Sequence, residues 1–153
     1  MTPFPIEPAR ADGPVRLVLS TFPDERSAVR FARAAVRRRL AACATLLPVR
    51  SIYRWNGRLV DDAERLVLFK TAPKRVGSLF AFLDERHPYT VPEVAEVDLP
   101  RVLSRYAAWV DTATRAGAEE GRVARLTSRP ARRRGLGGPP PARTRARRRR
   151  RSR

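Results

Sequence analysis

The middle of the chain reads Ser51-Ile52-Tyr53-Arg54-Trp55-Asn56-Gly57. Its β-branched and aromatic residues favour a strand, and Asn-Gly is the dipeptide best suited to a tight two-residue hairpin turn. The β-prone run extends back to Cys43, and a second apolar run follows at residues 66–71. These residues therefore predict a long antiparallel hairpin at the centre of the fold. Between the turn and the second run we expect an exposed bend or bulge, formed by the solvated residues Asp61, Asp62 and Glu64.

Strand and helix patterns flank this hairpin on both sides. Residues 15–22 form a continuous apolar run typical of a buried strand, and residues 24–40 carry an apolar stripe at helical spacing. After the hairpin, Pro73 opens a second helix, in whose first turn proline is tolerated. A last core strand is predicted at Val94, Val97 and Leu99, and a short amphipathic helix at residues 103–110.

This order of elements defines a fold class. The succession β-α-β-β-α-β plus a terminal helix predicts an α+β, ferredoxin-like sandwich, with a four-stranded antiparallel sheet and two helices on one face. One short helix covers little of the other face. We therefore expect a partner subunit to cover the rest, because large exposed apolar patches are rare on soluble monomers.

The connection between the second helix and the last strand carries the only histidine, His87. Pro88 biases the residue before it away from helical backbone, so the helix should end near His87. Tyr89 to Val91 should then be extended. This arrangement would place an imidazole, a phenol and the carboxylate of Glu93 on one ordered connection.

Composition divides the chain into three parts. We expect a flexible leader at residues 1–13, one folded domain at 14–114, and a disordered tail rich in Arg, Pro and Gly at 115–153. The chain has 153 residues and a formal charge of +18, and the tail alone holds fifteen arginines against two glutamates. A single cysteine excludes an intrachain disulfide and is compatible with a reducing cytoplasm. No apolar run approaches the roughly 18–20 residues of a membrane helix.

Together, six ordered motifs resemble the CutA family of divalent-cation tolerance proteins over residues 15–112. The motifs are residues 17–25, residues 39–44, the central run 51–57, Phe69-Lys70-Thr71, His87-Pro88-Tyr89-Thr90-Val91-Pro92-Glu93, and the closing pair Tyr106 and Trp109. The resemblance implies a ferredoxin-like protomer in a tight homotrimer similar to nitrogen-regulatory PII proteins. It also implies association with copper and other divalent metals. Clefts between subunits of such trimers gather the residues matching Cys43, Trp55, Lys70, Tyr89 and Glu93.

The resemblance bears on the metal ligands as well. Relatives linked to copper carry Cys where Ser20 stands and a second His where Arg86 stands, which leaves His87 of that set. We expect His87 and Cys43 as candidate ligands of a weakly bound copper ion. The alternatives are a structural His87 that bonds the backbone of its turn, and a buried inert thiol at Cys43.

The same residues allow a second kind of ligand. Lys70 and Glu93 lie at strand ends that a cleft would bring together. They would bind a small anionic molecule, with Tyr89 as hydrogen-bond donor, or form a salt bridge between subunits. Trp55 would pack against a neighbouring subunit.

An enzyme is not expected, because no nucleophile with an adjacent base is evident. The alternative function rests on the tail, where Arg147, Arg148, Arg149, Arg150 and Arg151 would bind nucleic acid without sequence preference while the folded part serves as a trimeric scaffold.

Overall fold

The computed structural model describes residues 13–116 and confirms the predicted order of elements. The elements are β1 (Val15–Phe22), α1 (Glu25–Arg37), β2 (Cys43–Trp55), β3 (Arg58–Thr71), a 3-10 turn (Pro73–Arg75), α2 (Val76–Arg86), β4 (Ala95–Leu99) and α3 (Ser104–Ala113). The strands form one sheet in the order β2-β3-β1-β4, and every neighbouring pair is antiparallel. The fold is the predicted ferredoxin-like α+β sandwich.

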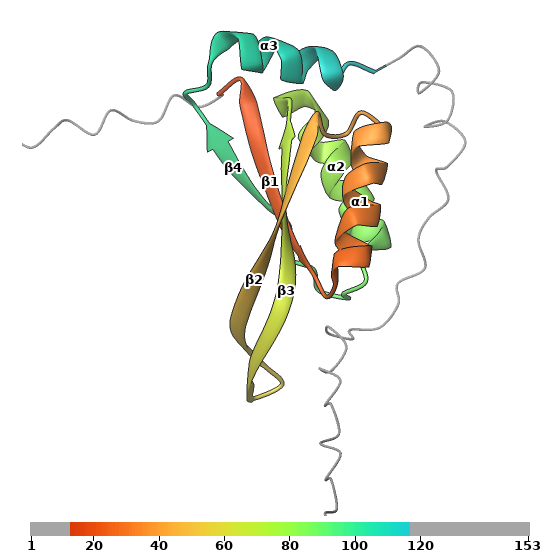
Figure 1. The fold of residues 1–153 in the computed structure, drawn as a ribbon, viewed down its shortest axis with the longest axis vertical. Helices are drawn as coiled ribbons and strands as arrows, with labels where there is room; N and C mark the ends of the chain where they lie inside the picture. Colours follow the sequence, from red (N-terminus) through yellow and green to blue (C-terminus); the bar gives the residue numbers. More distant parts are fainter. Residues whose placement is uncertain (1–12, 117–153) are drawn as a thin grey trace, which may run out of the picture.

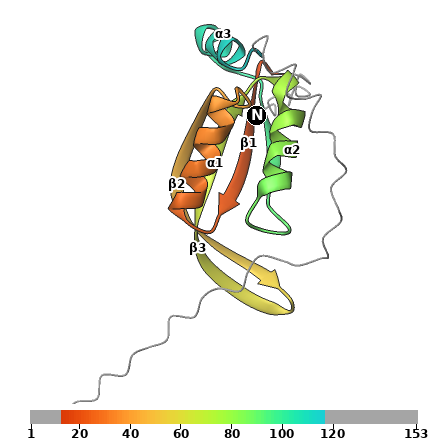
Figure 2. The same cartoon turned by 90° about the vertical axis from the view of Figure 1, so that its right-hand side faces the viewer.

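Helices α1 and α2 cover one face of the sheet, as Figures 1 and 2 show. Asp24 starts α1, because its side chain accepts the backbone N–H of Ser27 at 2.7 Å. The helix ends at Arg37, short of the predicted residue 40, and Arg39 adopts a φ of 55°. Between the helices and the sheet lies the main core, which includes Val18, Phe22, Phe31, Val67, Phe69, Leu79 and Leu83.

The short helix α3 crosses one end of the sheet (Figure 1). Val110 of α3 packs with Val15 and Ala42 in a second, smaller core cluster. Val15, Leu17 and Leu19 alternate along β1 with the core residue Val18, so they lie on the face opposite α1 and α2. Helix α3 therefore covers only the Val15 end of that face.

The middle of that face is apolar, and within the described chain no helix covers it. Leu19 pairs with Leu68, and the same face carries Leu47 and Val97, which are 36% and 42% exposed. We call this surface the open face. The sequence predicted that a partner subunit would cover this face.

The central hairpin is continuous, without the interruption that the sequence predicted. Strands β2 and β3 pair without interruption from Cys43↔Lys70 to Trp55↔Arg58. The turn has φ of 47° at Asn56 and 74° at Gly57, the two positive values that a tight hairpin turn requires. The predicted bend or bulge at Asp61, Asp62 and Glu64 is therefore wrong. These residues continue the ladder, and Glu64 is only 5% exposed.

Strand β1 pairs with β3 only from Arg65 to Thr71. Beyond Arg65 the hairpin continues as a two-stranded arm, which extends past the helices in Figure 1. Glu64 is the first β3 residue of this arm. No helix in residues 13–116 is long and apolar enough to cross a membrane.

Thr71 offers a test of how α1 is tied to the sheet. Its hydroxyl is fully buried and donates to the Leu40 carbonyl at 2.6 Å. Thr71→Val keeps the shape and removes the donor, so the free energy of unfolding should fall by about 1–2 kcal/mol. Urea unfolding at one fixed protein concentration measures it. Thr112→Val removes an exposed hydroxyl bond and serves as the control; equal shifts in both variants would contradict the expectation.

Candidate functional site

Helix α2 ends where the sequence predicted, because His87 leaves helical backbone with φ of −60° and ψ of 141°. The prediction that Tyr89 to Val91 are extended is wrong, since the backbone bends from residue 88 to residue 91. The reason is a local hydrogen bond: the backbone N–H of Tyr89 turns back and donates to Nδ1 of His87 at 3.1 Å. The bend carries the Tyr89 side chain towards the arm.

The hydrogen bonds of His87 determine its tautomer. Nδ1 accepts the Tyr89 N–H, so Nδ1 carries no proton. Nε2 lies 3.2 Å from Oγ of Ser20, and that hydroxyl donates its one proton to the Glu93 carbonyl at 2.7 Å. Ser20 must therefore accept from His87, which places the proton on Nε2. His87 is a neutral imidazole with both ring nitrogens engaged.

The surroundings of His87 favour this neutral form. Its ring stacks on Phe22 with centroids 4.6 Å apart, and the rings of Phe31 and Tyr89 lie within 6 Å. Burial lowers the pKa of His87 to about 4, against smaller raising effects from the Thr21 backbone and Asp84. The ring bonds its own turn, as the structural alternative predicted. A metal at Nδ1 would have to replace the bond from Tyr89, so the ligand role stays a prediction.

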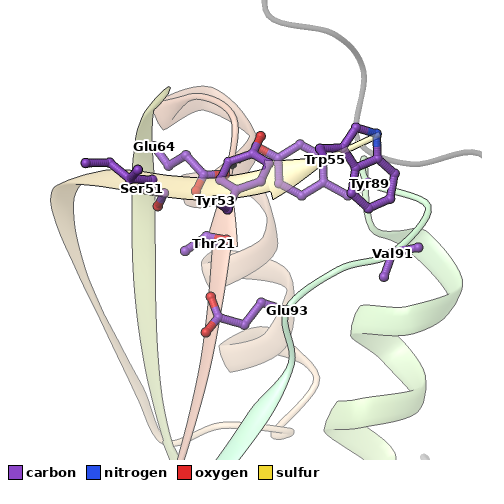
Figure 3. Close-up of a pocket in the computed structure, with 9 residues that line it drawn as sticks. Thr21, Ser51, Tyr53, Trp55, Glu64, Tyr89, Val91 and Glu93 are labelled. Carbon is purple, nitrogen blue, oxygen red and sulfur yellow. Dashed lines mark hydrogen bonds between the residues drawn. The ribbon is translucent and has the colours of Figure 1, made fainter. Parts of the chain in front are cut away.

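A hollow of about 470 Å³ lies between the arm and the bend after His87. Three aromatic side chains line it, and Figure 3 shows Tyr53, Tyr89 and Trp55 in a row across it. Glu64 lies at one end of this row and Glu93 lies apart from it, on the segment that follows the bend. The hollow thus unites predicted site residues Trp55, Tyr89 and Glu93 with two that the sequence did not assign to a site.

Those two are Glu64 and Tyr53, and each takes part in a hydrogen bond between a phenol and a carboxylate. The Tyr89 hydroxyl donates to Oε1 of Glu64 at 2.6 Å, and the Tyr53 hydroxyl donates to Asp62 at 2.9 Å. Burial, reinforced by Glu64, raises the pKa of Tyr89 well above its usual value. Burial and the Asp62 bond raise the pKa of Tyr53 to about 12. Both phenols therefore remain proton donors at any physiological pH.

Lys70 and Cys43 lie at the other end of the hairpin. They pair with each other across β2 and β3, whereas Trp55 is at the turn. From Cys43 to Trp55 the strand spans about 40 Å at roughly 3.3 Å per residue. Lys70 bonds Thr45 and the Leu68 carbonyl, so within one protomer it does not meet Glu93.

Within the described part of the chain, metal-ligating side chains do not cluster. Among residues 13–116 no group of three His, Cys, Asp or Glu side chains is placed to hold a metal ion. Cys43 is half-buried and pairs with Lys70, whereas His87 lies against Ser20 of β1. The arginines predicted to bind nucleic acid, Arg147 to Arg151, lie outside the described residues.

With this geometry established, comparison with known proteins identifies the family. The family model described as CutA1 divalent ion tolerance protein matches residues 16–113. Because that match spans more than half of the chain, the chain belongs to the CutA1 family.

Individual proteins similar to this chain are also CutA proteins. Divalent-cation tolerance protein CutA from Thermus thermophilus is 40% identical over 95 residues, which are 61% of this chain and 92% of that protein. Protein CutA from Mus musculus is 37% identical over 110 residues, 71% of this chain but only 62% of that longer protein. The crystal structure of CutA from Xylella fastidiosa superposes with a TM-score of 0.66 and 38% identity, covering 67% of this chain and all of that one.

The neutral His87 predicts a dependence of stability on acidity. The unfolded chain's imidazole binds a proton below about pH 6.5, whereas the folded one resists protonation until about pH 4. Stability should therefore fall as the pH drops through this window, by about 1–2 kcal/mol per protomer after allowing for the ring's partial exposure. Urea unfolding of the wild type and His87→Gln from pH 7.5 to pH 4 measures it. Parallel pH profiles of the two proteins would contradict the expectation.

The Tyr89 hydroxyl predicts a second effect. Tyr89→Phe leaves the buried Glu64 carboxylate without its donor, so the free energy of unfolding should fall by about 1–3 kcal/mol at pH 7. Tyr53→Phe is the matched control, because Asp62 is more exposed than Glu64, and the cost should stay below about 1 kcal/mol. Chemical unfolding of both variants compares them, and a larger loss for Tyr53→Phe would contradict the assignment.

Proposed function

We propose that this protein acts in divalent-cation tolerance as a cytoplasmic homotrimer that binds copper weakly at residues supplied by more than one copy. Family membership supports the link to divalent cations. The observation that carries the assembly is the open face, whose leucines and Val97 have no cover within the described chain. Burial of apolar surface drives association, and a face of this kind is typical of an interface.

The placement of candidate ligands favours a site shared between copies. In one protomer, Cys43 and His87 do not approach each other, and the described residues form no three-ligand cluster. Cys43 pairs with Lys70, which places both at the edge of the open face. A neighbouring copy that covers this face would bring its own groups towards the thiol. Thiolate and imidazole are ligands that suit copper.

The protein has no role as an enzyme in this proposal. The buried hydrogen-bonded groups of the described chain are occupied with one another: His87 with Ser20 and Tyr89, and Tyr89 with Glu64. What remains for ligands is a surface between copies and a solvent-open hollow. Such features suit binding of an ion or small molecule.

Sedimentation and calorimetry of the full chain test this proposal together. We expect a species of three protomers, and saturable copper binding that is weakened about tenfold or more in Cys43→Ser. Glu85→Gln, an exposed carboxylate change on α2, is the control and should bind copper as the wild type does. A monomer at micromolar concentration would overturn the assembly, and absence of copper binding to the wild type would overturn the metal role.

A further inference from the structure

A groove between helices α1 and α2 has the chemistry of an anion site. Its volume is about 230 Å³, and three arginine side chains line it together with apolar residues. Arg30 belongs to α1, Arg38 caps the end of that helix, and Arg86 lies in the last turn of α2. Among the described residues that line the groove there is no aspartate or glutamate. Its lining therefore carries positive charge only.

Two phenylalanine rings hold these guanidinium groups in place. The guanidinium carbon of Arg38 lies 5.0 Å from the ring centroid of Phe82, and that of Arg86 lies 5.4 Å from the same centroid. Arg30 lies 5.6 Å from the ring of Phe31, which packs on Phe82 with centroids 5.7 Å apart. Both rings belong to the main core, so they form a fixed floor. An aromatic face attracts a guanidinium group through the ring quadrupole and does not use its N–H donors, which lie in the guanidinium plane.

The three arginines have little negative charge around them. Within residues 13–116, neither Arg30 nor Arg38 forms an ion pair with a carboxylate. Arg86 meets its sequence neighbour Glu85 at 3.5 Å, and these two side chains are 48% and 65% exposed. An ion pair of this exposure contributes little. Packing on the same pair of rings thus gathers like charges, and a multiply charged anion would offset them.

A neighbouring copy that covers the open face does not supply the missing negative charge. Helices α1 and α2 pack on one side of the sheet, and the open face is the other side (Figures 1 and 2). The sheet therefore separates this groove from such a copy. The surplus of positive charge persists when the open face is covered.

Charge and size indicate which anion fits. Guanidinium groups bind phosphate and carboxylate oxygens through paired N–H donors. Three of them match the charge of a phosphate or diphosphate better than that of a monocarboxylate. The groove is smaller than the roughly 300–1,000 Å³ that sites for drug-sized molecules occupy, so it suits a phosphate group rather than a whole nucleotide.

We propose that the groove between α1 and α2 binds a small, multiply charged phosphate, such as diphosphate or the phosphate group of a small ester, through Arg30, Arg38 and Arg86. This site shares no lining residue with the hollow beside the arm. It also excludes Cys43, so it does not depend on the copper role.

Chemical modification of arginine in the full chain tests the site without any substitution. Phenylglyoxal modifies exposed guanidinium groups, and peptide mass spectrometry measures the rate at each arginine separately. Sodium pyrophosphate at millimolar concentration is the probe, with sodium chloride of equal ionic strength as the blank. We expect the rates at Arg30, Arg38 and Arg86 to fall about threefold or more, because a bound phosphate engages their N–H groups. The rate at Arg33, which lines a different groove between α1 and β2, should stay nearly unchanged.

Paired substitutions test the affinity. Arg30→Gln with Arg38→Gln removes two charges from the groove, so the tightest pyrophosphate binding in equilibrium dialysis should weaken about tenfold or more. Arg33→Gln with Arg37→Gln is the matched control, because it removes the same charge from the same helix but from the groove beside β2. It should bind pyrophosphate as the wild type does. The arginines of residues 117–153 are the same in both variants, so their contribution cancels in the comparison.

Carboxylates outside the described residues are a competing source of negative charge. Glu119 and Glu120 are among them, and they follow α3 in the sequence. If these carboxylates occupy the groove, Glu119→Gln with Glu120→Gln should make Arg30 and Arg38 more reactive towards phenylglyoxal in the absence of pyrophosphate. If the occupant is a small phosphate, the two rates should not change.

Four results would overturn the proposal. The first is protection of Arg33 by pyrophosphate equal to that of Arg30 and Arg38, which would indicate charge screening alone. The second is equal pyrophosphate affinity in the two double arginine variants. The third is increased reactivity of the groove arginines in the double glutamate variant. The fourth is a single-stranded oligonucleotide that displaces pyrophosphate and protects the arginines of both grooves alike, which would assign this helical face to nucleic acid.

Discussion

The turn at Asn56 and Gly57 determines the register of the hairpin, and through it the positions of the residues in the core and in the site. Its two positive φ angles close the hairpin with only two residues, so Trp55 must pair with Arg58. Every other pairing along β2 and β3 then follows in steps of one residue, down to Cys43 against Lys70. A slip of one residue would turn Leu68 into the helix-covered core and Phe69 out of it. The burial of Phe69 and the position of Glu64 are therefore two results of one register.

A second constraint acts at the other edge of the hollow. The neutral His87 ring links three segments: its Nδ1 accepts from Tyr89, its Nε2 donates to Ser20 of β1, and its face stacks on Phe22. Ser20 in turn bonds the Glu93 carbonyl. This chain of contacts fixes the bend that brings Tyr89 over Glu64. A single half-buried histidine thus organises the site without lining the hollow itself.

Much of the fold could be predicted from the sequence, and the site only in part. The spacing of apolar residues and the turn residues predicted the four strands and three helices of the described chain, because these signals are local. The failures came from contacts between distant residues. Asp61, Asp62 and Glu64 have the composition of an exposed bend, yet β2 supplies a partner strand and Tyr89 covers Glu64. A signal for this was present: counting back from the two-residue turn places Glu64 on the same face as Tyr53 and Trp55. The bend after His87 could not be found in this way, since it depends on a hydrogen bond to a side chain.

The arm makes local unfolding of the hairpin uneven along its length. From Arg65 to Thr71, β3 is held between two strands, but from Arg58 to Glu64 its only described neighbour is β2. An isolated two-stranded ribbon is marginally stable in water. In the sheet, β2 and β3 therefore open only when the whole fold unfolds, whereas in the arm they can fray alone. Amide protons of the two regions should exchange at very different rates. Glu64 and the hollow lie at this boundary, so the contacts that Glu64 makes there determine how far the fraying extends.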